Sequence, residues 1–294
     1  MKRIIFCLFC AGIVLSAMTL VACSGSSKAA SGGTEDSPAA VEILRIATDS
    51  VRLSDSLIVS GCKATVSISG QYPSDGPRPL LDSVRTWLAS SMFSVIPSAK
   101  ISEFTSDNEL LSSGKALADS CAKRLLAEAR NDFKNFGADG GRVDYEYVYS
   151  FGPLFESDRV SSFFITCYTY TGGAHGSTVS PDRSFDNNTG EMLTFDNIFR
   201  DDARDRLLTM ILNGLWRQYF KPSAAPGATL DDMLLVSRRE MSLPQNPPVF
   251  MSDGIAFTYQ QYEIAPYAAG LPRCVIPYAG LKPLMTPEGA ALIP

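Results

Sequence analysis

The stretch Val143-Asp-Tyr-Glu-Tyr-Val-Tyr-Ser-Phe151 decides the fold class of this 294-residue chain. Apolar and aromatic side chains occupy every second position, and three of the four positions between them are polar. Because successive side chains of a β-strand point to opposite faces, this alternation predicts a strand with one face on a core. Residues 160–170 follow with two fairly apolar faces, as in a central strand. A sheet is therefore predicted in the middle of the chain.

Helices are predicted on both sides of these strands. Apolar residues recur at helical spacing in residues 80–93, and the capping box Ser106-Asp-Asn-Glu109 begins a longer helix. Residues 201–220 predict a third helix with one apolar face, and a shorter helix is expected at 230–239. The other predicted strands lie at residues 41–53, 57–72, 180–185, 192–194, 249–251, 255–259 and 273–277.

The predicted helices and strands do not alternate evenly along the chain, which argues against a doubly wound parallel sheet. We expect an α+β fold of two halves, each an antiparallel sheet with helices packed on one face. The predicted divisions are a lipoprotein signal peptide at 1–22, a flexible tether at 23–40, an N-terminal domain at 41–158 and a C-terminal domain at 159–294.

Composition excludes several classes of protein. Hydrophobic residues make up 45% of the chain and charged residues 19%, which is enough apolar material for a folded core. The chain has 26 basic and 31 acidic residues and a net charge of −5, whereas a general nucleic-acid binder has a basic excess. The only long apolar stretch lies at the N-terminus, so a polytopic membrane protein is excluded.

The N-terminus is typical of an exported lipoprotein. Lys2 and Arg3 precede an apolar run over residues 4–20, and Leu20-Val-Ala-Cys23 resembles the lipobox of bacterial lipoproteins. The alternative is a transmembrane anchor, because about 18 apolar residues just span a bilayer. We expect acylation of the Cys23 thiol to hold the protein on a membrane of the cell envelope. Serine after Cys23 resembles a sorting signal for the periplasmic face of the outer membrane, if the organism has one.

No cofactor or metal is expected. A metal site would need several ligands, but the chain has one histidine and no Cys-x-x-Cys spacing. Disulfides can persist in an envelope compartment, and the four cysteines of the predicted body allow three pairings between which the sequence does not choose. These cysteines are Cys62, Cys121, Cys167 and Cys274.

The single histidine lies in the glycine-rich loop Thr171-Gly-Gly-Ala-His-Gly176, directly after a predicted strand. One interpretation is a ligand loop, in which backbone amides face the ligand and His175 acts as a recognition donor or as an acid or base. The other, which we favour, is a tight turn with Gly172 and Gly173 at positive φ. Ser177 is close in sequence, but no third group of a catalytic triad is identifiable.

Glu263 lies among apolar and aromatic residues in Tyr262-Glu-Ile-Ala-Pro-Tyr267. It is either a half-buried acid with a raised pKa or a carboxylate bonded to the backbone of a loop, and the second is favoured. Tyrosine rings stack on sugars or anchor protein partners, although most are expected in cores or on sheet faces. These tyrosines are Tyr145, Tyr147, Tyr149, Tyr168, Tyr170, Tyr259, Tyr262 and Tyr267.

Three segments together resemble the domain of unknown function shared by RsiV-type anti-sigma factors and PdaC-type peptidoglycan deacetylases. They are residues 170–176, residues 185–199 with Leu193-Thr-Phe-Asp-Asn-Ile-Phe199, and residues 253–270. Their order and spacing fit that domain, and the resemblance covers roughly residues 160–285. The preceding half is similar to the partner domain that usually accompanies it.

The resemblance implies an extracytoplasmic α+β module associated with the cell wall. In RsiV-like proteins this region senses lysozyme by binding it, and in PdaC-like proteins it precedes a separate catalytic domain. Neither a sigma-binding segment nor a deacetylase domain is expected here, and no catalytic residue carries over. We expect a non-enzymatic binding module for a lysozyme-like protein or peptidoglycan, with a wall glycan hydrolase using Glu263 or His175 as the alternative. The expected ligand-binding residues are Tyr170, Gly172, Gly173, His175, Tyr262, Glu263 and Tyr267.

Overall fold

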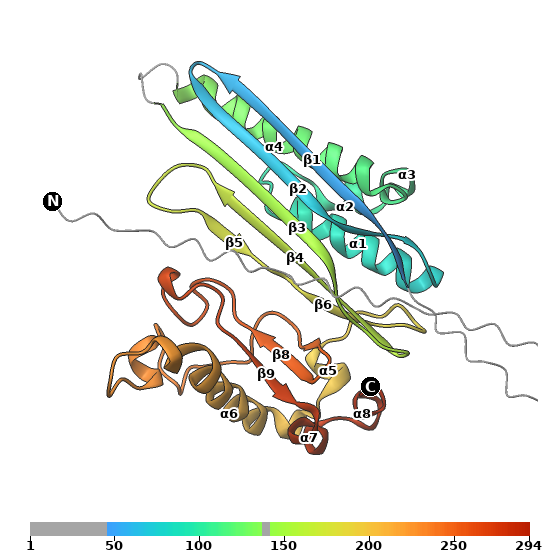
Figure 1. Ribbon diagram of the computed structural model, residues 1–294, viewed down its shortest axis with the longest axis vertical. Helices are drawn as coiled ribbons and strands as arrows, with labels where there is room; N and C mark the ends of the chain where they lie inside the picture. Colours follow the sequence, from blue (N-terminus) through green and yellow to red (C-terminus); the bar gives the residue numbers. More distant parts are fainter. Residues whose placement is uncertain (1–45, 137–141) are drawn as a thin grey trace, which may run out of the picture. The chain divides into compact units, whose positions relative to one another are not determined.

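A computed structural model describes residues 46–136 and 142–294, which lie within one compact unit. Two β-sheets and their helices form this unit, and the predicted α+β class is confirmed (Figure 1). Within the described residues no helix is long and apolar enough to cross a membrane. The expected signal peptide, Cys23 and tether lie outside the described residues.

The first sheet has six strands in the order β1-β2-β3-β4-β5, with β6 also paired to β4. The predicted alternation from Val143 to Phe151 is confirmed, because the tyrosines of β3 are buried and the residues between them are not. The strands are β1 (Ala47–Val59), β2 (Cys62–Asp75), β3 (Asp144–Glu156), β4 (Val160–Tyr170), β5 (Ser177–Val179) and β6 (Arg183–Asp186).

The expectation of purely antiparallel sheets is wrong at one place, since β2 pairs with β3 in parallel. The chain between these two strands consists of helices, and such a crossover returns the chain in the same direction as it left. In Figure 1 the helices α1 and α4 run behind the sheet. The four helices of the crossover are α1 (Arg78–Ser94), α2 (Ile101–Thr105), α3 (Asn108–Leu111) and α4 (Gly114–Phe136).

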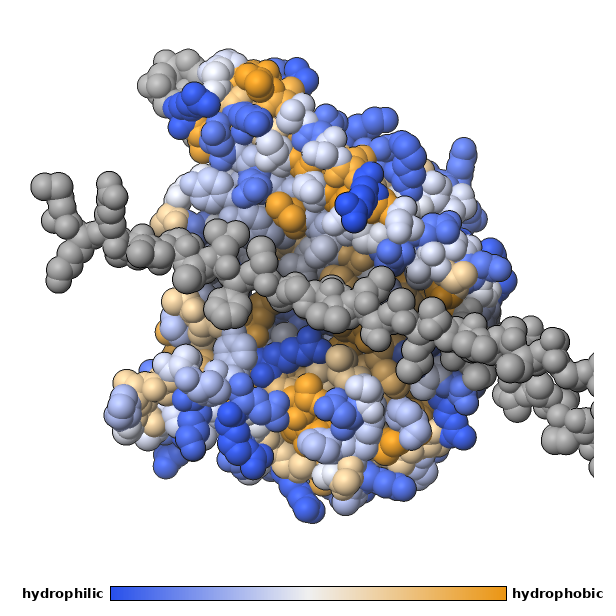
Figure 2. Space-filling model, viewed as in Figure 1, coloured by the Kyte–Doolittle hydropathy of each residue, from blue (hydrophilic) through white to orange (hydrophobic). Residues whose placement is uncertain are grey.

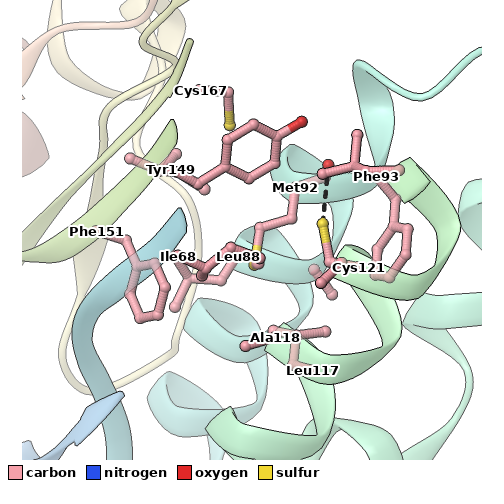
Figure 3. Close-up of a cluster of buried hydrophobic side chains, with 14 of the residues drawn as sticks. Ile68, Leu88, Met92, Phe93, Leu117, Ala118, Cys121, Tyr149, Phe151 and Cys167 are labelled. Carbon is pink, nitrogen blue, oxygen red and sulfur yellow. Dashed lines mark hydrogen bonds between the residues drawn. The ribbon is translucent and has the colours of Figure 1, made fainter. Parts of the chain in front are cut away.

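The first core lies between this sheet and the helices α1 and α4. Figure 3 shows its centre, where Tyr149 of β3 lies beside Cys167 of β4 and its side chain extends toward Met92 of α1 and Cys121 of α4. Burial raises the pKa of the Cys167 thiol to about 12. Cys121, Cys167 and Cys274 are buried free thiols, and no disulfide joins them.

The Tyr149 hydroxyl is buried and has no hydrogen-bond partner among the described residues. An unsatisfied buried hydroxyl costs about 1–3 kcal/mol. We therefore expect Tyr149→Phe to raise the free energy of unfolding by about 1 kcal/mol. Chemical denaturation at equilibrium measures this change, and a loss of stability would show that the hydroxyl makes a favourable interaction.

The second sheet packs with the remaining helices around a separate core. It is antiparallel throughout and has the order β7-β8-β9. The strands are β7 (Val249–Phe250), β8 (Gly254–Thr258) and β9 (Arg273–Pro277), and the α-helices are α5 (Phe195–Ile198), α6 (Arg204–Leu215), α7 (Tyr278–Leu281) and α8 (Pro287–Ala291). Short 3-10 turns lie at Asp201–Ala203, Lys221–Ser223, Leu230–Met233, Tyr267–Ala269 and Lys282–Leu284, and a π turn at Trp216–Phe220.

Several predicted boundaries are wrong. The first hairpin turns at Ser60 and Gly61, both at positive φ, rather than at residues 54–56. The helix predicted from residue 106 is divided into α3 and α4, and the Ser113 hydroxyl caps α4 by accepting from the Ala116 amide at 3.2 Å. The helix predicted at 230–239 is only the turn Leu230–Met233.

The predicted division at residue 159 falls between β3 and β4, which pair along most of their length in one sheet. Strands from both predicted halves therefore build the first sheet. That the two halves form separate domains stays a prediction. Contacts between the sheets include the backbone amide of Phe250 in β7, which donates to the Ser184 hydroxyl of β6 at 2.9 Å.

Candidate functional site

Two loops that are far apart in the sequence meet beside the end of β4. The His175 ring, from the loop after β4, stacks on the Tyr267 ring with centroids 3.7 Å apart and planes 16° apart. Tyr262 lies next to both rings, at centroid distances of 6.3 Å from His175 and 6.0 Å from Tyr267. We call His175, Tyr262 and Tyr267 the aromatic cluster.

Hydrogen bonds fix the His175 ring. Its Nδ1 lies 2.9 Å from the Gly176 carbonyl oxygen, which only accepts, so Nδ1 carries a hydrogen. In the neutral ring Nε2 is then an acceptor, and the Tyr262 hydroxyl donates to it at 3.1 Å. No hydrogen bond joins the ring to Ser177, so the described geometry does not contain a serine–histidine pair.

Glycine occupies these loop positions for two different structural reasons. Gly172 and Gly173 have φ of +94° and +87°, which favour glycine, and the Tyr170 hydroxyl donates to the Gly173 carbonyl at 3.1 Å. A Cβ on Gly176 would lie 2.4 Å from the Tyr168 ring. The turn expected from the sequence is therefore present, and it also presents His175 to the second loop.

Tyr168 belongs to this site, although the list of expected ligand-binding residues omits it. Partial burial raises its pKa, with contributions from the negative charge of Glu146 and from Tyr267 and Tyr170. Side chains two positions apart on a strand point to the same face, so Tyr168 and Tyr170 of β4 share one face of the sheet. This alternation is the sequence feature that could have indicated Tyr168.

Glutamine side chains anchor the second loop to β5. The Gln261 Oε1 accepts from the Thr178 amide at 2.8 Å, and the Gln260 side chain bonds both the amide and the carbonyl of Ser180. Neither glutamine could be identified from a local pattern, because their partners are backbone groups about 80 residues away. The two loops are thus held together by polar contacts as well as by the rings.

Glu263 is bonded to the backbone, as the favoured interpretation predicted. Its Oε1 accepts from the Gln245 amide at 2.8 Å, and its Oε2 accepts from the Gln260 amide at 2.7 Å. The carboxylate therefore joins two segments of the second loop region. Both of its oxygens accept backbone hydrogen bonds, and Glu263 is next to Tyr262 in sequence.

Tyr262 has an unusual backbone for its size. Its φ is +64°, a region that bulky residues rarely adopt, and its side chain is 55% exposed. Bonds at both neighbours, Gln261 and Glu263, hold this conformation. Strained residues of this kind occur often at binding sites, where the surrounding structure fixes them in place.

The site carries aromatic rings and donors rather than metal ligands. In residues 46–136 and 142–294 no group of three or more histidine, cysteine or acidic side chains is placed to hold a metal ion. The surface on the side of the molecule shown in Figure 2 is largely hydrophilic, with small apolar patches. Exposed rings that carry hydroxyl and ring N–H groups suit the recognition of a partly polar ligand.

A segment in the second half of the chain is similar to a known family of proteins. Residues 196–279 match a family model described as "Protein of unknown function (DUF3298)", within the stretch for which a resemblance was expected. No protein with curated annotation matches the chain. The link to RsiV-type and PdaC-type proteins stays a prediction.

Two solved structures are similar to this one. A DUF3298 family member from Bacteroides fragilis NCTC 9343 is 20% identical, with a TM-score of 0.67 over 84% of this chain and 96% of that chain. A DUF3298 family protein from Pseudomonas aeruginosa PAO1 is 15% identical, with a TM-score of 0.50 over 84% of this chain and 97% of that chain. Residues 196–279 therefore match the DUF3298 family model, and the fold of the chain is similar to that of solved members of that family.

Proposed function

We propose that this chain is a lipid-anchored, non-enzymatic protein of the cell envelope that binds peptidoglycan through the aromatic cluster. The observation that carries the proposal is the fixed arrangement of the exposed His175 and Tyr262 with the half-buried Tyr267. Sugar rings present apolar C–H faces and polar edges, which match aromatic faces flanked by hydroxyl and ring N–H groups. Fixed rings also lose little conformational entropy when a ligand binds.

The anchor part of this proposal rests on the lipobox-like sequence at Leu20-Val-Ala-Cys23. Two or more acyl chains give stable attachment, since each buried methylene contributes about 0.8 kcal/mol. An anchored protein with a binding site for the wall polymer is held between membrane and wall. Mass spectrometry of the mature protein tests acylation of Cys23.

A lysozyme-like protein is the second candidate ligand, and the charge of the chain favours it. The net charge is −5, and removal of residues 1–22 with their two basic residues leaves 24 − 31 = −7. Glu146 and Asp144 are exposed on β3, and Glu146 lies opposite Tyr170 in the sheet register. Acidic groups near Tyr168 and Tyr170 attract a basic protein, and salt screens that attraction.

The hydrolase alternative has less support. Both oxygens of Glu263 accept backbone hydrogen bonds, and both nitrogens of His175 are engaged within the cluster. A glycosidase needs two carboxyl groups across the scissile bond at a defined separation. We find no feature of the aromatic cluster that favours this chemistry over binding.

We expect Tyr262→Ala to weaken binding of soluble peptidoglycan fragments at least tenfold, because the variant loses the exposed ring and its bond to His175. Loss of one stacking ring is worth about 1–3 kcal/mol in comparable base-stacking sites, which covers this factor. Titration calorimetry with the purified full chain measures the change. Tyr262→Phe keeps the ring and should keep most of the affinity.

Leu235→Ala is the matched control, because Leu235 is 57% exposed and lies outside the cluster. It should leave binding unchanged. The same titrations with a basic lysozyme across a salt series separate the two ligands, since charge-driven binding weakens steeply with salt and stacking does not. Equal affinity of the Tyr262→Ala variant and the unmodified protein for both ligands would refute the proposed site.

A further inference from the structure

A concave surface lies between the helices α1 and α2 and the segment from β5 to residue 192, and its volume is about 820 Å³. This volume is within the range of sites that hold small ligands, about 300–1,000 Å³. Trp87 of α1 forms part of the wall, and its indole nitrogen donates to the Pro181 carbonyl at 3.2 Å. None of the aromatic cluster residues lines it. We call it the α1 groove.

Arg183 lines the α1 groove, and only some of the N–H groups of its guanidinium form hydrogen bonds. Its Nη1 donates to the carbonyls of Pro181 at 3.2 Å and Asp182 at 2.8 Å. The Nε and Nη2 atoms bond to no other described residue, and no described carboxylate forms an ion pair with the guanidinium. The Asp182 carboxylate next to it is instead bonded to Ser180 and paired with Arg273 at 3.8 Å.

This unpaired guanidinium is half-buried, and burial lowers its pKa, with Asp182 acting in the opposite direction. A partly buried charge whose donors are only partly used is stabilised further by an anion that accepts from its remaining N–H groups. The fork of N–H donors that remains on Nε and Nη2 matches the two oxygens of a carboxylate.

The rest of the α1 groove suits a ligand with apolar and amide groups. The hydroxyls of Ser83, Thr86 and Ser90 line it and form no hydrogen bond with other described residues. Met192 and Ile101 line it with side chains that are 47% and 38% exposed, two of the few large hydrophobic residues exposed in the described part. Hydroxyls bond peptide groups, and the apolar residues contact aliphatic side chains.

We infer that the α1 groove binds a short peptide with a free C-terminal carboxylate, which Arg183 holds by its Nε and Nη2 donors. Asp82 and Glu191 also line the groove, so a doubly charged phosphate meets more repulsion than a single carboxylate does. The inference does not depend on the ligand of the aromatic cluster, because the two sites share no residue.

The test uses the two tryptophans of the chain, Trp87 and Trp216. In a full-length Trp216→Phe background, the remaining fluorescence comes from Trp87 in the groove wall. We expect trialanine to change this fluorescence in a saturable way, and trialanine amide, which lacks the carboxylate, to bind at least tenfold more weakly. Inorganic phosphate should also bind more weakly than trialanine.

Arg183→Gln should weaken trialanine binding at least tenfold, and Arg206→Gln, on an exposed part of α6, should leave it unchanged. Ser90→Phe fills the groove without touching the guanidinium bonds and should also abolish binding. Equal binding of trialanine and its amide, or tighter binding of phosphate, would overturn the inference. Loss of peptide binding with intact peptidoglycan binding at the aromatic cluster would refute this site alone.

Discussion

Gly190→Ala is expected to lower the free energy of unfolding by about 3 kcal/mol, the sum of a left-handed backbone and a steric clash. Gly190 has φ of +73°, and a Cβ there would lie 2.3 Å from the Pro79 carbonyl oxygen at the start of α1. Backbone atoms cannot move aside as a flexible side chain can, so either the turn after β6 or α1 must shift. Chemical denaturation of the purified protein measures the loss.

Gly227→Ala is the matched control for this prediction. Gly227 has φ of +84°, and a Cβ there would meet no atom within 4 Å. Only the backbone term remains, so the expected loss is about 1 kcal/mol. The difference between the two variants isolates the contact between the turn and α1. Equal losses would show that this contact is less close than described.

Glu263→Ala is expected to lower the free energy of unfolding by about 2–3 kcal/mol, because two charge-assisted hydrogen bonds to backbone amides are lost. The amides belong to Gln245 and Gln260, so the change releases two segments from each other. Gln260 precedes the strained Tyr262, and we therefore expect peptidoglycan binding to weaken together with stability. Denaturation and calorimetry on the same preparation report both.

Glu240→Ala is the matched control for the Glu263 variant. The Glu240 carboxylate also accepts a backbone hydrogen bond, but its partner is Ser237, three residues away in the same exposed loop. Loss of this hydrogen bond should lower the free energy of unfolding by less than about 0.5 kcal/mol. If Glu263 were instead a catalytic acid, Glu263→Gln would keep full stability; here we expect it to be destabilised, because its NH₂ group meets a backbone donor.

Local patterns predicted the elements whose burial is periodic. The alternation in Val143–Phe151 and the helical spacing in residues 80–93 both appear in the structure, in β3 and α1. The direction of β3 relative to β2 was not predicted correctly, because parallel pairing depends on the path of the chain through α1 to α4. The interruption before α4 was also missed, although its cap is local: the Ser113 hydroxyl accepts from the Ala116 amide.

The sequence by itself determined the α+β class and the turn at Gly172 and Gly173, because backbone geometry and side-chain periodicity are local properties. It indicated His175, Tyr262 and Tyr267 as candidate site residues but not Tyr168. Only the tertiary structure decided that His175 meets Tyr262 and Tyr267, since 87 residues separate His175 from Tyr262. It also decided that Glu263 bonds two amides and that Arg183 has no ion-pair partner among the described residues. These features depend on which groups reach one another after folding, which no local pattern encodes.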